Sequence, residues 1–474
     1  MGSQIVIVIL SILSYSQSHH RCRLQKLLAI YLKFKGISAK GFDTLHAMAL
    51  TMSHKWTCNS VKRISERGMD EVRQRARKDS WSLAYDNLQL PMTVYSQRID
   101  SKSQFGNGTA ATVFVKRDAK PLSSSANQDL KTQRARGMKD PLTGTDIMNL
   151  ARRSTPRLIK QAEYYVLQFL LNSPEFDQKT YSGRRSDLLQ QLAPVDRLPY
   201  GPDHITLQYL LGTVDRPEAS YADHEFLLNE WLQQLGWDND EGRKRLAAER
   251  VVTWVGDQLT IDRIRGVYTA RAEDSNSYER LDFSIFTFGW LHCQMAFANS
   301  LHKQYLGNNH GRGLKHAFTL LDRKGLTKVL TKGPFHHDLE EALYHVAEAH
   351  FREDWLQIGR VMKLEDLRKK NPEELRALAK RIVAERASTE ALNRQDHLPE
   401  NSRDEELRQV IMWNRDILDY IILDHAIEEG DVGIMEMMLP HLYIRFHGGG
   451  NGNYAEEVLE LMQGLEKEWP NEIW

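Results

Sequence analysis

The segment Arg250-Val-Val-Thr-Trp-Val-Gly-Asp-Gln-Leu-Thr-Ile261 decides the fold class of this chain. Its β-branched apolar run predicts a short buried strand over residues 250–257 that stops at Gly256-Asp257. The segment Trp81-Ser-Leu-Ala-Tyr-Asp86 repeats the arrangement, so a second strand is expected to end in Asp86. Two strands that each end in an aspartate predict two carboxylates that converge on a metal pair. The alternative is that each aspartate forms a turn or caps a following helix.

The charge of the chain is unevenly distributed, although its 474 residues carry no net charge. Residues 1–160 hold 27 Lys and Arg against 11 Asp and Glu, a net charge of +16, and residues 396–474 hold 5 against 18, a net charge of −13. The basic part is expected to contact a polyanion, and the acidic part metal ions or the basic part. Alternatively, both are solvated faces that pack together. The length allows two or three domains with a large core.

The cysteines and the N-terminus indicate the compartment. Cys22, Cys58 and Cys293 form no C-x-x-C pair, which argues against a disulfide framework and favours a reducing environment. The apolar run from Ile5 to Leu13 is too short to span a bilayer and lacks the basic flank of a signal peptide. We therefore expect a nuclear or cytoplasmic protein that is not secreted and has no membrane partner.

Residues 1–78 are expected to form a helical module. A short helix over residues 42–50, a turn with Ser53 as N-cap and a basic helix from His54 to Arg77 give the outline of a helix-turn-helix. The side chains expected to hold nucleic-acid phosphates are Lys55, Lys62, Arg63, Arg67 and Arg73. The alternative is a helical hairpin that does not contact DNA.

The rest of the chain is expected to divide into three parts. Residues 79–265 are predicted to form a mixed sheet core, with strands over 81–85, 94–99 and 109–115, a turn at 105–108, and a polar insertion at about 116–200 that begins with a loop or linker over 116–146. Residues 266–400 are predicted to be a helical insertion that includes a long helix from Ser284 to Lys303. Residues 401–474 are predicted to be an acidic helical part that packs on the core.

A metal-dependent phosphoryl-transfer site would need a third carboxylate on a helix beside Asp86 and Asp257. Glu457, just after a glycine-rich turn, is the leading candidate, and the three residues are predicted to hold Mg²⁺ and to be catalytic. Other carboxylates compete with Glu457 for the third place: Glu456, Glu460, Asp262, Asp424, Glu428 and Asp431. The turn itself, Gly448-Gly-Gly-Asn-Gly452, lacks a P-loop pattern, and no nucleotide or organic cofactor is indicated.

A zinc site is a separate possibility on the predicted helix after residue 335. His337, Glu341 and His345 follow one another at a spacing of four, which places them on one helical face and could hold Zn²⁺ for a hydrolase. The spacing is not H-E-x-x-H. A face rich in His and Glu is also what a solvated, ion-paired helix presents.

Six motifs together resemble a large fungal domain family of unknown function, found in many copies in transposon-like reading frames of mushroom-forming fungi. They are Tyr85-Asp86-Asn87, Arg98–Ser103, Asn107–Thr112, Val255–Thr260, Leu423–Asp431 and Gly448–Ala455. By analogy with multicopy families of this kind, the resemblance implies an α-rich mixed α/β fold. Its core would be a ribonuclease-H-like mixed sheet, with a helical N-terminal module and large helical insertions.

The family itself implies no activity, and the function expected from the same analogy is that of a transposon-derived nucleic-acid-binding protein. Its catalytic form would be a transposase-like, metal-dependent DNA phosphoryl-transfer enzyme with Asp86, Asp257 and Glu457 on Mg²⁺ and DNA as partner. The alternative from another class is a non-catalytic helical scaffold or domesticated interaction protein.

Overall fold

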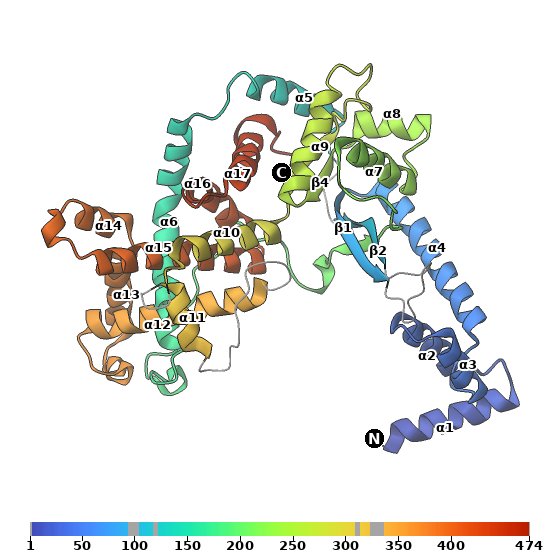
Figure 1. Ribbon diagram of the computed structural model, residues 1–474, viewed down its shortest axis with the longest axis horizontal. Helices are drawn as coiled ribbons and strands as arrows, with labels where there is room; N and C mark the ends of the chain where they lie inside the picture. The colour runs from blue at the N-terminus through green and yellow to red at the C-terminus, as the bar shows by residue number, and fades with distance from the viewer. Residues whose placement is uncertain (1, 93–103, 117–121, 309–312, 323–335, 474) are drawn as a thin grey trace. The chain divides into compact units, whose positions relative to one another are not determined.

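The computed structural model describes residues 2–92, 104–116, 122–308, 313–322 and 336–473 (Figure 1). The fold is mixed α/β and mostly helical. The chain divides into two compact units: unit 1 contains Met1–Pro121, Thr206–Pro217 and Glu225–Arg243, and unit 2 contains Leu122–Ile205, Glu218–His224 and Lys244–Trp474. Both units are therefore built from separated pieces of sequence, and they cut across the four consecutive parts expected from it.

The N-terminal part of unit 1 is helical, as predicted. Its helices are α1 (Gly2–Gln17), α2 (Arg23–Phe34), α3 (Ala39–Ala47) and α4 (His54–Lys78). Ser53 caps α4, since its side chain accepts a hydrogen bond from the backbone N–H of Trp56 at 3.2 Å. The sequence of short helix, turn and long basic helix is thus confirmed.

The strands of unit 1 form an antiparallel sheet in the order β3-β2-β1. They are β1 (Trp81–Met92), β2 (Gln104–Val115) and β3 (Leu207–Leu210), and Trp81 pairs with Val115. The turn predicted at 105–108 is wrong, because Asn107 and Gly108 pair with Gln89 and Leu88 and so extend β2. The strand expected over 94–99 lies outside the described residues.

The core of unit 1 lies under one face of this sheet. Leu83 and Tyr85 alternate with more exposed residues along β1, which is the period of a half-buried strand. The ring of Tyr85 lies 6.3 Å from that of Trp231, which is fully buried on α7 (Tyr221–Gln234). Trp237, between α7 and α8 (Asp240–Glu249), is also fully buried.

Unit 2 contains a parallel strand–helix–strand arrangement. The strand β4 (Val252–Gly256) is where the sequence predicts it, α9 (Gln258–Ala270) follows, and β5 (Ser284–Phe288) pairs with β4 in parallel. The single helix predicted from Ser284 to Lys303 is wrong in its first part. The β-prone Ser-Ile-Phe-Thr-Phe run pairs with β4, and α10 (Trp290–Tyr305) begins only after Gly289.

The loop or linker predicted over 116–146 is wrong in part. Residues 117–121 lie outside the description, but α5 (Ala126–Gly137) occupies much of the stretch from residue 122 to 146. Asn127 donates a hydrogen bond to the carbonyl of Arg250 at 2.9 Å, so this basic segment is attached to the start of β4. The segment forms a helix despite its polar composition. Its Leu130 side chain is fully buried, and the helix packs onto the rest of unit 2.

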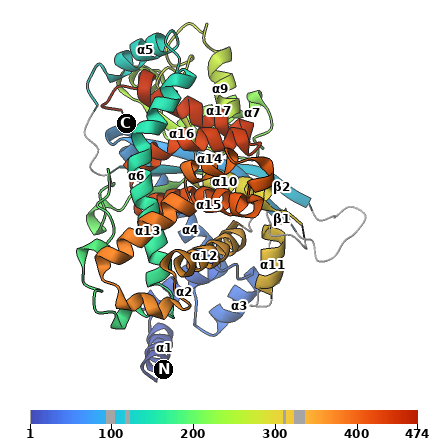
Figure 2. The same cartoon turned by 90° about the vertical axis from the view of Figure 1, so that its left-hand side faces the viewer.

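Four of the remaining helices of unit 2, namely α12, α13, α15 and α16, pack against α6 (Gly144–Leu171), and the others pack on these four (Figures 1 and 2). The remaining helices are α11 (Leu314–Asp322), α12 (His336–Gly359), α13 (Pro372–Arg386), α14 (Thr389–Asp396), α15 (Glu405–Glu429), α16 (Val432–Gly448) and α17 (Gly452–Gln463). A π-helical turn follows at Gly464–Glu468, and short 3₁₀ turns lie at Gln178–Thr180, Asp187–Leu189, Pro202–His204, Leu364–Lys369 and Glu400–Ser402.

The helices α13 and α16 of this part each contain a proline. The helix α16 continues through Pro440. Asn371 caps α13, with Pro372 in its first turn. None of the helices in the described part of the chain is long and apolar enough to cross a membrane.

Candidate functional site

Asp86 does not end a strand, so this part of the predicted site is wrong. It lies inside β1 opposite Ala110, because Leu88-Gln-Leu continues the pairing with β2 as far as Met92. Its side chain is exposed, and one carboxylate oxygen accepts a hydrogen bond from the backbone N–H of Asn87 at 2.7 Å. Asp86 therefore projects from the face of the sheet in unit 1 and not from a strand end.

Asp257 directly follows β4, as the sequence predicts, and it is also a helix cap. Its carboxylate accepts a hydrogen bond from the backbone N–H of Thr260 at 2.7 Å, which satisfies a free donor at the start of α9. The strand-end position and the capping role, considered as alternatives from the sequence, are therefore both present.

Glu457 lies on the first turns of α17, which packs against α9 and β5. Only 2% of its surface is exposed, and the guanidinium of Arg265 on α9 donates two hydrogen bonds to the carboxylate, at 2.7 and 3.2 Å. Burial raises the pKa of Glu457, and the Arg265 guanidinium opposes this rise. A bidentate arginine is the partner that a buried carboxylate needs to stay ionised.

The predicted metal ligands are not assembled as a metal site in the part of the chain that the structure describes. No three His, Cys, Asp or Glu side chains are grouped there so that they could hold an ion. Within unit 2, both oxygens of Glu457 accept hydrogen bonds from Arg265, so a metal there would have to displace this arginine, and one oxygen of Asp257 is occupied by the cap of α9.

Asp424, one of the competing carboxylates, belongs to a buried polar cluster between α10, α12 and α15. The side-chain amide of Gln294 donates to Asp424 and, at 3.1 Å, to Glu340. The hydroxyl of Tyr344 donates to Asp424, and that of Tyr420 to Glu340 at 2.7 Å. Burial raises the pKa of Asp424, and the nearby charge of Glu340 raises it further.

This cluster was missed at the sequence level. Its signal is a spacing of four on two predicted helices, Glu340 to Tyr344 and Tyr420 to Asp424, which places an acid and a phenol on one face. Each carboxylate is fixed by two neutral donors. The arrangement therefore joins three helices through satisfied hydrogen bonds in the core.

The zinc alternative places its residues on α12, as expected, but on its solvent side. The side chain of His337 is 86% exposed and lies 3.7 Å from Glu340, and Glu341 and His345 are also exposed. Among the described residues of this helix, too, no three His, Cys, Asp or Glu side chains are grouped so that they could hold a metal ion. The structure therefore favours the solvated helix face over a zinc site.

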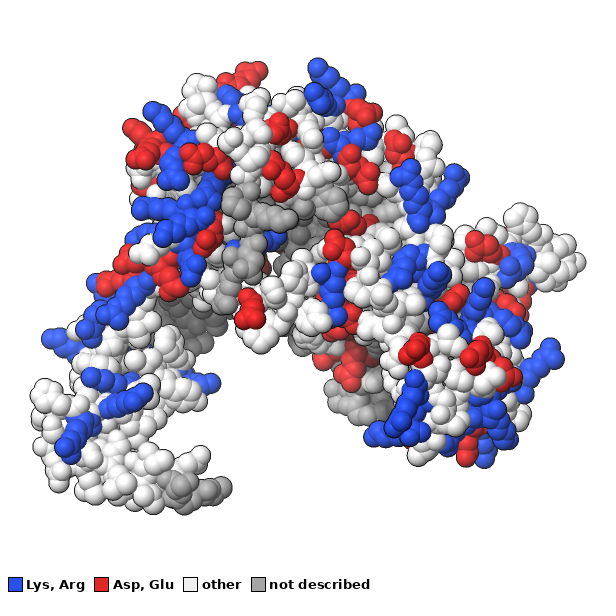
Figure 3. Space-filling view, turned by 180° about the vertical axis from the view of Figure 1, so that it is seen from behind, with Lys and Arg blue, Asp and Glu red and all other residues white. Residues whose placement is uncertain are grey.

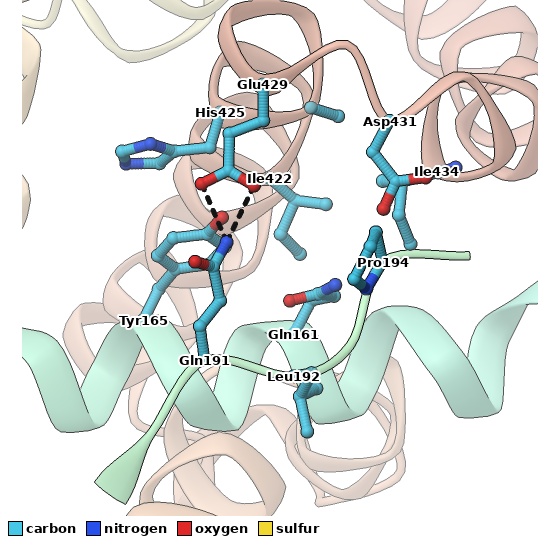
Figure 4. Close-up of a pocket in the computed structure, with 11 residues that line it drawn as sticks. Gln161, Tyr165, Gln191, Leu192, Pro194, Ile422, His425, Glu429, Asp431 and Ile434 are labelled. Carbon is cyan, nitrogen blue, oxygen red and sulfur yellow. Dashed lines mark hydrogen bonds between the residues drawn. The ribbon is translucent and has the colours of Figure 1, made fainter. Parts of the chain in front are cut away.

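A small cavity lies beside the Leu423–Asp431 motif, between α6, α15 and residues 191–194 (Figure 4). Its volume of 10 Å³ has room for about one water molecule. Glu429 accepts two hydrogen bonds from the Gln191 amide at 2.7 and 2.8 Å, and His425 stacks on Tyr165 with ring centroids 4.8 Å apart. These contacts hold the end of α15 against α6 and residue Gln191, and the cavity is too small for an organic ligand.

The basic face of α4 is the most extended charged feature among the predicted site residues. Lys55, Lys62, Arg63 and Arg67 are exposed, whereas Arg73 is half-buried and donates to the carbonyl of Gln234 at 2.8 Å. Spacings of seven between Lys55 and Lys62 and of four between Arg63 and Arg67 place these cations along one broad side of the helix. On the face of the molecule in Figure 3, the N-terminal helices show more Lys and Arg than Asp and Glu.

Acidic residues neutralise this face only weakly. Glu66 lies 3.9 Å from Lys62, with both side chains more than half exposed, which is the geometry of a surface pair of little energy. Lys55 and Arg67 form no ion pair within the described ranges. Their charge is therefore available to an external anion.

Comparisons with known proteins give a family and no function. No curated protein and no solved structure matches the chain. The family model matches β3 to β5 and α6 to α17, and it leaves out α1 to α4, β1 and β2. The chain belongs to the family of unknown function DUF6589, whose model covers residues 137–473.

Proposed function

We propose that this chain is a nucleic-acid-binding protein that uses the exposed basic face of α4 to contact the phosphate backbone. The observation that carries the proposal is the row of exposed cations Lys55, Lys62, Arg63 and Arg67 on one helix. Cations on a rigid helix neutralise phosphates without ordering a loop, and they release counterions when they bind. Such contacts position a protein on a duplex without reading its sequence.

A transposon-derived, ribonuclease-H-like origin is the wider form of the proposal. It is supported by the order of elements, in which three antiparallel strands precede a parallel β4–α9–β5 arrangement and a long helical region. That order is typical of a ribonuclease-H-like fold. The motifs that resemble fungal transposon-like reading frames support it as well. If the chain descends from a transposon-encoded protein, α4 belongs to the part of that ancestor that bound DNA.

The geometry supports binding better than metal-dependent phosphoryl transfer. The two carboxylates of unit 2 that would hold Mg²⁺ already have partners, Arg265 for Glu457 and the N-terminus of α9 for Asp257. We therefore propose DNA binding as the activity of this chain and assign no catalytic step. A non-catalytic interaction protein that uses the same basic face for an acidic protein is the competing proposal.

The test is the salt dependence of binding to a short labelled DNA duplex, measured by fluorescence anisotropy with the full chain. The variant combines Lys55→Ala, Lys62→Ala, Arg63→Ala and Arg67→Ala. Each lost phosphate contact removes about 0.9 from the slope of log affinity against log salt, so the slope is expected to fall by roughly 3 to 4. Alanine favours helix, so α4 should persist, which circular dichroism checks.

The matched control removes four exposed cations from unit 2 through Lys363→Ala, Lys369→Ala, Lys380→Ala and Arg381→Ala. It is expected to leave the slope unchanged. An equal loss in both variants would mean that only total charge matters, and the assignment to α4 would fail. A plasmid-nicking assay with Mg²⁺ or Mn²⁺ completes the test, because nicking that Asp257→Asn abolishes would support the catalytic alternative. Asparagine also caps helices, so this substitution keeps the start of α9.

A further inference from the structure

The outer surface of α1 is apolar from Ile5 to Leu13. The helix carries no charged residue, and six of its aliphatic side chains are each more than half exposed: Ile5, Val6, Ile7, Ile9, Leu10 and Leu13. Isolated exposed aliphatic residues are ordinary on a protein surface. Six on one helix form a continuous patch, and such patches mark sites of interaction.

This helix is attached to the rest of unit 1 by its other side. Gln25 of α2 is fully buried and donates hydrogen bonds to the carbonyl of Ser11 at 3.3 Å and to that of Ala49 at 3.1 Å. Tyr15 and Cys22 are buried beside it. The exposed side chains therefore face away from a packed, hydrogen-bonded contact.

A second apolar stripe lies on α2. Leu27, Tyr31 and Phe34 are 60%, 56% and 70% exposed, and their spacing of four and three places them on one side of the helix. Basic side chains flank the stripe, and the ammonium group of Lys35 lies 5.7 Å from the centre of the Tyr31 ring. We call the exposed residues of the two helices, with these flanking cations, the α1–α2 surface.

The charge around this surface has one sign. Residues 1–42 contain no Asp or Glu, and their six cations are Arg21, Arg23, Lys26, Lys33, Lys35 and Lys40. On the face of the molecule in Figure 3, the N-terminal helices show white and blue with little red. Aliphatic side chains beside cations, without acids, complement a surface of acyl chains under anionic headgroups.

From this chemistry we propose that the α1–α2 surface binds peripherally to an anionic lipid bilayer, which differs from the expectation, drawn from the lack of a spanning segment, that the chain has no membrane partner. The 16 residues of α1 span about 24 Å, which is shorter than a hydrocarbon core of about 30 Å, so the helix would lie in the interface. A nucleic acid would attract the cations but would leave the aliphatic side chains in water. A two-fold contact with a second copy would bring together two surfaces whose flanking charges have the same sign, a repulsion that disfavours self-association.

The experiment is co-sedimentation of the full chain with large vesicles of phosphatidylcholine alone or mixed with phosphatidylserine. The variant combines Ile9→Gln, Leu10→Gln and Leu13→Gln, all at exposed positions. The natural sequence is expected to bind the anionic vesicles and not the neutral ones. The variant is expected to lose roughly tenfold or more in partition coefficient, because each aliphatic chain that inserts adds to the binding free energy.

A control variant with Met138→Gln, Leu210→Gln and Met362→Gln changes three exposed apolar residues elsewhere and should bind like the natural sequence. The four-alanine variant of α4 should also retain binding. If it loses as much binding as the α1 variant, the lipid contact belongs to α4. Equal binding to neutral and anionic vesicles would show that the cations do not contact anionic headgroups, and the proposal of an anionic bilayer would fail. No binding to either vesicle, or a concentration-dependent dimer in ultracentrifugation that the α1 variant abolishes, would overturn the proposal.

Discussion

Among single residues, Asp354 is expected to control how the stability of the fold depends on pH. This carboxyl on α12 is 4% exposed, accepts a hydrogen bond from Asn414 at 2.8 Å and lies 3.8 Å from Arg386. Burial raises the pKa of Asp354 to about 7, although Arg386 and Asn414 oppose the shift. The folded state therefore binds a proton that the unfolded chain releases near pH 4.

The sign of the effect follows from this difference. Because the folded pKa lies above the unfolded one, the contribution of Asp354 is greatest below about pH 4 and is lost as the pH rises towards 7, by an amount of a few kcal/mol. Asp354→Asn is expected to flatten this decline and to raise the melting temperature at pH 8. Thermal unfolding between pH 5 and pH 8 measures it, with the exposed Glu365→Gln as control. A variant that parallels the natural protein at every pH would contradict the assignment.

Between elements, the Arg265–Glu457 pair is expected to contribute strongly to the packing of α17 on α9. Removal of one partner of a buried ion pair leaves the other charge without compensation, which costs about 3–5 kcal/mol. Arg265→Ala should therefore lower the free energy of unfolding by about that amount in urea titrations. The double variant Arg265→Met, Glu457→Met should recover much of the loss, because an apolar pair carries no buried charge.

The control for this pair is Arg271→Ala, which breaks the more exposed contact with Asp274 at 3.0 Å. It should cost less than about 1 kcal/mol. If Arg265→Ala is equally mild, Glu457 is protonated or compensated by another group. The Glu457 carboxylate would then not depend on Arg265, and the proposal that it binds a metal ion would become stronger.

The same elements show what the sequence could and could not predict. The helix α4 and the strand β4 follow from local periodicity, and the Ser53 cap follows from capping preference. The strand β5 was missed because five apolar and small residues before a helix have no period of their own. The pairing of Glu457 with Arg265 could not be predicted, since 192 residues separate them and the contact exists only after α17 has packed on α9.

Across the whole molecule, the interleaved units predict that unit 1 cannot fold from its first segment alone. The chain passes between the units five times, and β3 and the Trp231 and Trp237 side chains are supplied by segments after residue 205. A fragment of residues 1–121 lacks these two buried indoles. It also lacks the hydrogen bond of Tyr209 to Glu71 at 2.7 Å. The lost burial amounts to a few kcal/mol for each indole.

The fragment 1–121 is therefore expected to keep helical signal from α4 but to melt without a cooperative transition and to bind a hydrophobic dye. Co-expression with residues 122–474 should restore it as a complex, because the second fragment supplies β3 and both tryptophans. The control joins residues 1–121 to 206–243 through a Gly-Ser linker and should regain a sigmoidal melt. A sharp transition of residues 1–121 by themselves would show that the N-terminal helices and hairpin form an independent domain. The DNA and vesicle experiments could then be carried out on that segment alone.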